Sequence, residues 1–206
     1  MMRPGRGAWW VLLLSLIGFQ PLAFATPPAY AEPREAGRPA WQPVSRGADE
    51  VRMKVVAVDP SNPRLLYAGS ARAVYVSHDG GSAWRERFRL PAAAELTGLA
   101  IDPFDSRRVL AATTSGLYGS FDGARHWTRL FRGAGAGESR CQAVLFHPLH
   151  RQEVFLGTAG GLFLSADGGR RWQELGVRLR NRSVRHLAID PRQPQRLYAL
   201  TDQGLF

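Results

Sequence analysis

The chain has 206 residues, a net charge of +10 and one cysteine, Cys141. A single cysteine excludes an internal disulfide, so the folded part must be held together by burial and hydrogen bonds. Arginine supplies 26 of the 27 basic residues. This bias is typical of a GC-rich genome and also of a surface that attracts anions, and the sequence leaves both explanations open.

Residues 1–25 have the pattern of a secretory signal peptide. Arg3 and Arg6 give a positive start, residues 8–19 are an apolar run, and Ala23 and Ala25 fit a small-x-small cleavage site. The run is short for a bilayer span of roughly 20 residues. We therefore expect cleavage after residue 25, with residue 31 as the second choice. The mature chain is then secreted or periplasmic, without a stable membrane span.

Residues 26–40 contain four prolines and little that could pack. This composition predicts an extended linker. The remaining residues, 41–206, are enough for one domain with its own core.

From residue 51 the chain repeats with a period near 43. Four dipeptides, each an aspartate or histidine followed by proline, have successive separations of 43, 45 and 43. They begin at Asp59, Asp102, His147 and Asp190. Such constant spacing indicates a repeat architecture. It divides the chain into repeats at 51–94, 95–139 and 140–182, and a partial repeat at 183–206.

Each repeat has the pattern of four short strands. In the first repeat these are 55–58, 65–70, 73–77 and 84–88, which are rich in β-branched and aromatic residues and bounded by turn residues. Helical spacing is absent after the signal, so the predicted fold class is all-β, with four-stranded antiparallel sheets. One such sheet cannot bury both faces, and radial stacking as β-propeller blades solves this problem. We expect core aromatics on the second strands, at Tyr67, Phe155 and Tyr198.

Three copies of one motif lie between the third and fourth predicted strands. A hairpin there needs glycine for positive φ, while serine and aspartate side chains can accept hydrogen bonds from the turn amides. The motif residues are Ser77, Asp79, Gly81 and Trp84, then Ser120, Asp122 and Trp127, then Ser165, Asp167, Gly169 and Trp172. Because the motif recurs, we expect a structural role and assign no catalytic residue. One carboxylate per copy also predicts no bound metal.

These runs resemble the Asp-box, or BNR repeat, of sialidase-like and related propellers, whose pattern is Ser-x-Asp-x-Gly-x-x-Trp. The second copy has Ala124 where the pattern has glycine, which costs about 1 kcal/mol if the position needs positive φ. The whole repeat looks like exported propellers related to photosystem II assembly factors, and like sortilin-type and xyloglucanase-type propellers. The resemblance implies a propeller with structural boxes and no cofactor. It covers both protein-binding scaffolds and polysaccharide hydrolases.

The two ends of the domain differ from the repeats. The spacing from Trp41 to Asp59 equals the spacing from Trp84 and from Trp172 to the aspartate-proline dipeptide that follows each of them. Residues 41–50 are therefore predicted to be an orphan outer strand that completes the last sheet. The fourth repeat stops before its motif, which favours a fragment of a larger ring and leaves open a nearly closed four-bladed propeller. We expect oligomers only if one chain does not close the ring.

Recognition is expected at the links between sheets. The links from each motif tryptophan to the next proline dipeptide vary in length, the second being longer than the other two, and variable loops on a rigid frame commonly bind partners. The predicted binding residues are Arg87, Arg89, Arg132, Arg140, Arg178, Arg180, Arg182 and Arg185. They indicate a non-catalytic binding propeller for a protein or an anionic partner such as an acidic glycan. Solvated arginines in a GC-rich chain explain the same pattern.

A glycoside hydrolase is the alternative function, with catalytic residues partly outside this chain. Sialidases place the first arginine of a substrate-binding triad in an (F/Y)RIP motif, and residues 88–91, FRLP, resemble it with one substitution. No glutamate and tyrosine pair is recognisable. The five histidines lack metal-ligand spacing, and neither a nucleophile elbow nor a phosphate loop is present. The export signal argues against a nucleic-acid partner.

Overall fold

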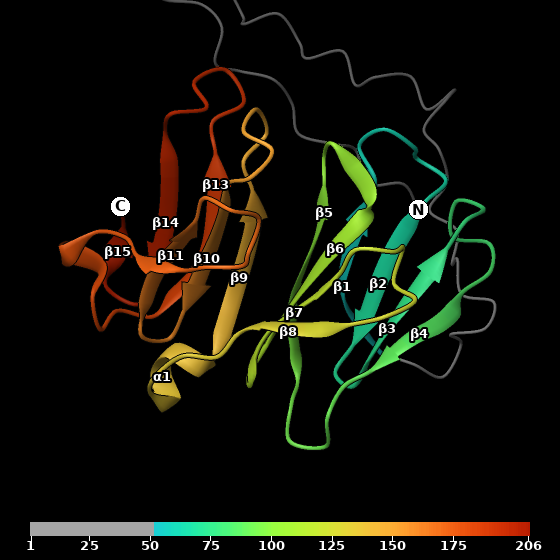
Figure 1. The fold of residues 1–206 in the computed structure, drawn as a ribbon, viewed down its shortest axis with the longest axis horizontal. Helices are drawn as coiled ribbons and strands as arrows, with labels where there is room; N and C mark the ends of the chain where they lie inside the picture. Colours follow the sequence, from blue (N-terminus) through green and yellow to red (C-terminus); the bar gives the residue numbers. More distant parts are fainter. Residues whose placement is uncertain (1–51) are drawn as a thin grey trace, which may run out of the picture. The chain divides into compact units, whose positions relative to one another are not determined.

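The computed structural model describes residues 52–206 as four antiparallel sheets of consecutive strands (Figure 1). The signal peptide, the linker and the predicted outer strand at 41–50 lie outside these residues. The first sheet contains β1 (Met53–Val58), β2 (Leu66–Ser70), β3 (Ala73–Ser77) and β4 (Arg85–Arg89). The second contains β5 (Leu96–Asp102), β6 (Asp105–Thr113), β7 (Gly116–Ser120) and β8 (Thr128–Phe131).

The third sheet contains β9 (Cys141–Phe146), β10 (Val154–Thr158), β11 (Gly161–Ser165) and β12 (Gln173–Glu174). The last contains β13 (Val184–Ile189), β14 (Leu197–Thr201) and β15 (Gly204–Leu205). In the first sheet, β3 covers the predicted range, and the other strands differ from prediction by one or two residues at one or both ends. β4 starts one residue after Trp84, because the tryptophan belongs to the turn.

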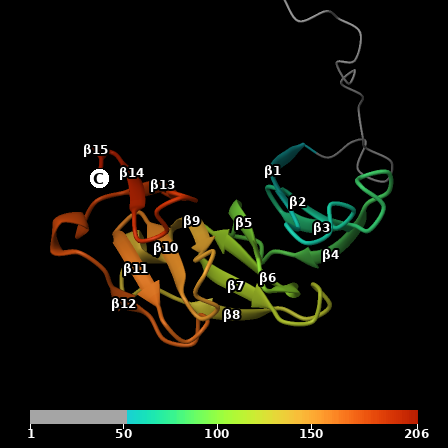
Figure 2. The ribbon, with the colours of Figure 1, turned by 90° about the horizontal axis from the view of Figure 1, so that it is seen from above.

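The sheets pack in chain order through their first strands. β1 contacts β5, β5 contacts β9, and β9 contacts β13. Each sheet therefore lies against the next one, as Figures 1 and 2 show. Packing of four-stranded antiparallel sheets in this way is the arrangement of propeller blades, and the predicted all-β fold is confirmed.

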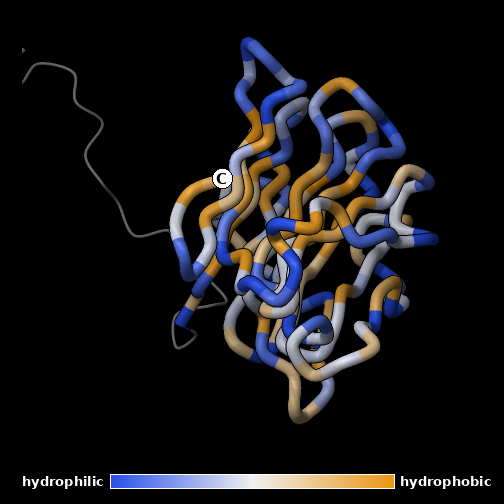
Figure 3. Tube along the Cα trace, turned by 90° about the vertical axis from the view of Figure 1, so that its left-hand side faces the viewer, coloured by the Kyte–Doolittle hydropathy of each residue, from blue (hydrophilic) through white to orange (hydrophobic). Residues whose placement is uncertain are grey.

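Three apolar cores fill the spaces between the four sheets. Tyr67 and Val109 lie fully buried in the first core, Leu110 and Val154 in the second, and Val184 in the third. Figure 3 shows the apolar residues concentrated along the strands and the hydrophilic ones at the turns. The two middle sheets thus bury both faces against their neighbours, and the first and last sheets bury one face each.

One predicted core aromatic is not buried. Tyr67 is 0% exposed and Phe155 8%, but Tyr198 is 38% exposed. All three have the same place in their repeats. The face of the last sheet that carries Tyr198 has no further sheet against it within residues 52–206, so the side chain gains less burial.

Two short helical segments depart from the expectation of no helix. α1 (Ala136–Ser139) is a single turn, and η1 (Val177–Leu179) is a 3-10 turn. Both lie in links between sheets, where no strand pairing dictates the backbone. At α1 the Ala134 amide donates to Glu138 Oε2 at 2.8 Å, which closes the glycine-rich loop locally.

Candidate functional site

The three motif turns (77–84, 120–127 and 165–172) are held together by their own side chains. In the first turn, Ser77 Oγ donates to Asp79 Oδ1 at 2.7 Å and accepts from the Gly81 amide at 2.8 Å. Asp79 Oδ1 also accepts from the Ala83 amide at 2.9 Å. The second and third turns repeat these bonds. One oxygen of each motif carboxylate is therefore engaged by its own turn.

These bonds keep the motif carboxylates charged. In each turn the pKa of the aspartate is lowered from its ordinary value, mainly by a hydrogen bond from the amide four residues further on. The aspartates are Asp79, Asp122 and Asp167. A general acid needs a raised pKa near neutral pH, so their environment does not suit that role.

Ala124 adopts the left-handed conformation that the other turns assign to glycine. Its φ is +66°, against +95° at Gly81 and +91° at Gly169. The Ala124 amide still donates to Ser120 Oγ at 2.9 Å, so the turn is closed. The alanine backbone is displaced toward the smaller φ of the left-handed helical minimum, where a Cβ is best tolerated.

Hydrogen bonds place the motif turns and the proline turns at one end of the sheets, which we call the motif end. There the Gly123 amide donates to the Arg107 carbonyl at 2.9 Å. Equivalent bonds join Gly80 to Arg64 and Gly168 to Gln152. The links between sheets lie at the opposite link end, where the Leu90 amide donates to the Arg72 carbonyl at 2.9 Å.

The structure distributes the predicted arginines among several environments. Arg89 pairs with Glu86 at 2.8 Å, and Arg180 pairs with Glu174 at 2.8 Å. Arg182 is half-buried, donates to Gln203 and lies over the Phe206 ring. Four others are exposed and have no side-chain partner within residues 52–206. These are Arg132, Arg140, Arg178 and Arg185.

Arg87 belongs to a different site from the other seven. It lines a groove of about 340 Å³ between the first and second sheets. Other lining residues come from the motif end, including His78, Arg107, Phe121 and Arg125. The predicted face at the link end therefore does not include Arg87. Sequence reasoning missed this groove because its residues come from two repeats.

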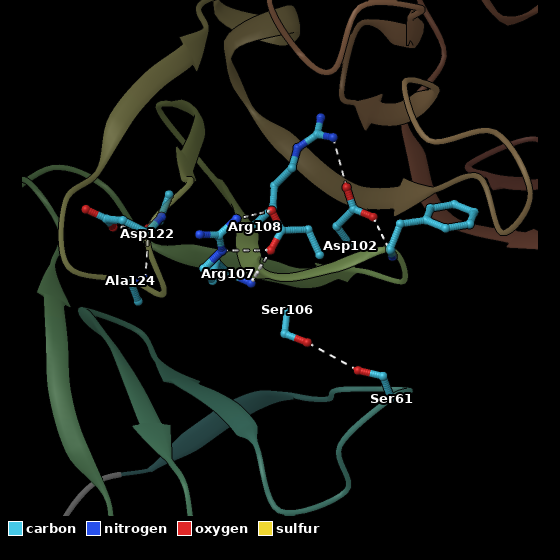
Figure 4. Close-up of polar contacts among 10 residues, drawn as sticks. Ser61, Asp102, Ser106, Arg107, Arg108, Asp122 and Ala124 are labelled. Atoms are coloured by element: carbon cyan, nitrogen blue, oxygen red, sulfur yellow. Dashed lines mark hydrogen bonds and ion pairs between the residues drawn. The ribbon is translucent and has the colours of Figure 1, made fainter.

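Arg108 fills the corresponding position between the second and third sheets. Its Nη1 lies 2.9 Å from Asp102 Oδ2, and its Nη2 donates to the Gly168 carbonyl at 2.5 Å. The Arg108 and Asp102 side chains are only 10% and 4% exposed, and Figure 4 shows them facing each other. The ion pair lies within the second sheet, and the bonds from Arg108 to the Gly168 and Arg151 carbonyls connect that sheet to the third. The sequence feature that could have indicated this contact is Arg108, a charged residue six places after Asp102. The first repeat has Leu65 six places after Asp59.

His147 takes the part of an aspartate in its proline turn. Its Nδ1 accepts from the Leu149 and His150 amides at 3.1 and 3.0 Å, as aspartate oxygens do in the other proline turns. Its Nε2 lies 3.2 Å from the Pro194 carbonyl. His147, His150 and Glu153 have ligand atoms within 4.8 Å of one another. Both His147 nitrogens are engaged, so these residues do not suit a metal.

The FRLP run at 88–91 is explained by packing. The Phe88 ring stacks on Trp127 with centroids 4.8 Å apart, and Leu90 is buried. Arg89, between them, is 72% exposed and paired with Glu86. The FRLP run therefore alternates between buried and exposed side chains, as an outer strand with one buried face does.

The solved structures that resemble this chain are propeller-type proteins. A GH74 xyloglucanase from Xanthomonas campestris aligns with a TM-score of 0.62 and 22% identity, over 74% of this chain and 27% of the enzyme. YCF48 bound to a D1 peptide aligns with a TM-score of 0.56 and 13% identity, over 74% of this chain and 48% of YCF48. The described part of the chain has a β-propeller fold.

The likeness extends to the fold alone at these identities. The computationally designed Ika4 protein also aligns, with a TM-score of 0.57 and 14% identity, over 81% of this chain and 98% of Ika4. The chain spans about a quarter of the GH74 enzymes it matches. No protein-family model and no curated protein matches the sequence. Within residues 52–206, no helix has the length and apolarity to cross a membrane.

Proposed function

We propose that this chain is an exported, non-catalytic binding propeller that recognises an anionic ligand or an acidic protein segment through arginine side chains. One observation carries the proposal: Arg87 and Arg125 line one groove and have no side-chain partner within residues 52–206. The lining carboxylate, Asp122, is bonded to its own turn and to His126. Positive charge in the groove is therefore left for a ligand.

Exposed arginines at the link end support the same function. Arg132, Arg140, Arg178 and Arg185 are solvent-accessible without ion pairs among the described residues. They raise the local concentration of anions through long-range attraction, which weakens with salt. The groove then provides the specific contacts.

Two features of the described residues favour binding over glycoside hydrolysis. Glycosidases generally use two carboxyl groups that flank the scissile bond, one with a raised pKa. The groove lining contains a single carboxylate, and the pKa of that residue, Asp122, is lowered by backbone hydrogen bonds. The FRLP arginine is exposed and paired with Glu86.

Salt-dependent binding tests the proposed function. Heparin oligosaccharides and a poly-glutamate peptide would be titrated into the purified chain by calorimetry at low and at high NaCl concentration. We expect binding at low salt that weakens at least about tenfold at high salt. Salt-insensitive association, or release of reducing sugar from xyloglucan or a sialoside, would contradict a non-catalytic arginine site.

Export is tested separately by cell fractionation and mass spectrometry of the mature chain. We expect the protein outside the cytoplasm, with its N-terminus at Thr26. A cytoplasmic protein that retains residues 1–25 would refute the signal peptide while leaving the groove unaffected.

A further inference from the structure

The groove between the first and second sheets lies where the first repeat has leucine at the place that Arg108 takes in the second. In the second sheet, Arg108 extends from β6 and fills the space toward the third sheet. The same place in the first sheet is Leu65, which lines the groove. Leucine is shorter and apolar, so it neither fills this space nor donates a hydrogen bond.

The lost arginine leaves a buried acceptor without a donor. In the second sheet, Asp102 Oδ2 receives Nη1 of Arg108. The equivalent residue in the first sheet is Asp59, which is 2% exposed. Its Oδ1 accepts from the Ser61 and Asn62 amides, but its Oδ2 has no hydrogen-bond partner among the described residues. A buried carboxylate oxygen without a donor is unfavourable, but Asp59 is not among the residues that line the groove.

The wall of the groove that the second sheet forms is also unfilled. A Cβ built on Gly168 would lie 2.8 Å from Arg108 Nη2, whereas a Cβ on the equivalent Gly123 meets nothing within 4 Å. Gly123 and Ser106 both line the groove. Their carbonyls correspond to those of Gly168 and Arg151, which accept from Arg108 between the next two sheets. The groove thus combines the backbone carbonyls of two lining residues, Ser106 and Gly123, with an unfilled volume.

The surrounding charge decides which kind of donor fits. Arg87, Arg107 and Arg125 line the groove together with His78. Arg107 is paired with Asp105, but Arg87 and Arg125 have no such partner among the described residues. A cationic donor would be repelled by them, whereas a hydroxyl donor would not. The same two arginines suit a carboxylate on the ligand.

Two aromatic residues complete the groove. Phe121 is 49% exposed and offers an apolar ring face. Burial raises the pKa of Tyr67 to about 12, with Asp59 adding to the effect, so its hydroxyl stays protonated at neutral pH. A volume of about 340 Å³ is at the lower end for small-molecule sites.

We infer that this groove binds an acidic sugar residue, a uronic acid, with its carboxylate on Arg87 and Arg125 and its hydroxyls toward the carbonyls of Ser106 and Gly123. The sugar ring lies against Phe121, as apolar ring faces commonly stack on aromatic side chains. The inference deepens the proposed function by naming the ligand class, and it depends on that function.

The test is an NMR titration of the full ¹⁵N-labelled chain with glucuronate, glucose and acetate. We expect saturable shifts of groove amides with glucuronate, and at least about tenfold weaker binding of the other two, since each keeps only part of the contacts. Equal affinity for acetate and glucuronate would overturn the inference and indicate a simple anion site.

Variants of the chain locate the binding. Leu65→Arg should rebuild the arrangement of Arg108, fill the groove and abolish glucuronate binding, while Leu65→Met should retain it. Arg125→Ala should weaken binding at least about tenfold, and Arg170→Ala, the same place in the third motif turn, should not. Thermal unfolding confirms that each variant is folded. Unchanged binding in Leu65→Arg would overturn the inference.

The two proposals fail in distinguishable ways. If heparin or poly-glutamate binds through the arginines while glucuronate does not, the uronic-acid site is refuted and the anion-binding function stands. If none of these anions binds, both are refuted.

Discussion

Ala124 and Gly169 have the same place in successive motif turns, but only at Ala124 does the backbone have a φ that accommodates a Cβ atom. Gly169 has a φ of +91°, and a Cβ there would lie 3.3 Å from Leu130 Cδ1. Gly169→Ala should therefore lower the free energy of unfolding by roughly 1 to 2 kcal/mol, measured by urea denaturation.

The reverse substitution, Ala124→Gly, provides the control. It relieves about 1 kcal/mol of backbone strain but removes a fully buried methyl group, which contributes about 0.8 kcal/mol. The two effects nearly cancel, so we expect little change. A stabilisation well above about 1 kcal/mol would mean that the methyl packs poorly.

Arg108 connects the second and third sheets, and its removal leaves the buried Asp102 without its ion-pair partner. Arg108→Leu copies the residue found in the first repeat, so it should fit sterically. We expect a loss of about 3 to 5 kcal/mol in urea unfolding, because a buried ion pair is broken at one partner. Adding Asp102→Asn should recover part of the loss. An additive double variant would show that the two side chains are not coupled.

The motif turn is an element whose stability depends on charged aspartate. The pKa values of Asp79, Asp122 and Asp167 are lowered in the folded chain. Their contribution is therefore complete above the unfolded pKa of about 3.9 and is lost as the pH falls below it toward the folded values. We expect urea stability to fall below about pH 4. Asp122→Asn should show a shallower acid slope, and an unchanged slope would assign the acid loss to other groups.

The elements were more predictable than the contacts between them. Alternating apolar residues and turn glycines marked the strands, because both act within one repeat. The environment of Arg87 could not be predicted, since it depends on which residues of the next sheet face β4. The constant repeat spacing showed that Leu65 and Arg108 have equivalent places. That Arg108 bonds to the next sheet could not be predicted, because this depends on where Gly168 lies in the third sheet. The repeat spacing placed His147 in a proline turn, but its contact with the Pro194 carbonyl required the position of the last sheet.

At the scale of the whole molecule, each sheet is stabilised by its interfaces with the adjoining sheets. Each sheet packs only on the sheets that adjoin it in the chain, so unfolding should depend on nearest-neighbour interfaces. β6 has four consecutive core residues, Val109 to Ala112, with no exposure. In β14, by contrast, Tyr198 is 38% and Leu200 43% exposed.

Amide hydrogen exchange should follow this difference in burial. We expect the amides of β6 and β10 to exchange only by global unfolding, and those of β14 to exchange faster by local opening of the last sheet, since fewer apolar contacts hold it. NMR exchange rates with a urea series distinguish the two modes, because local opening depends weakly on urea. Equal protection of β14 and β6 would mean that the Tyr198 face is covered in solution, and the sheets would then unfold as one cooperative unit.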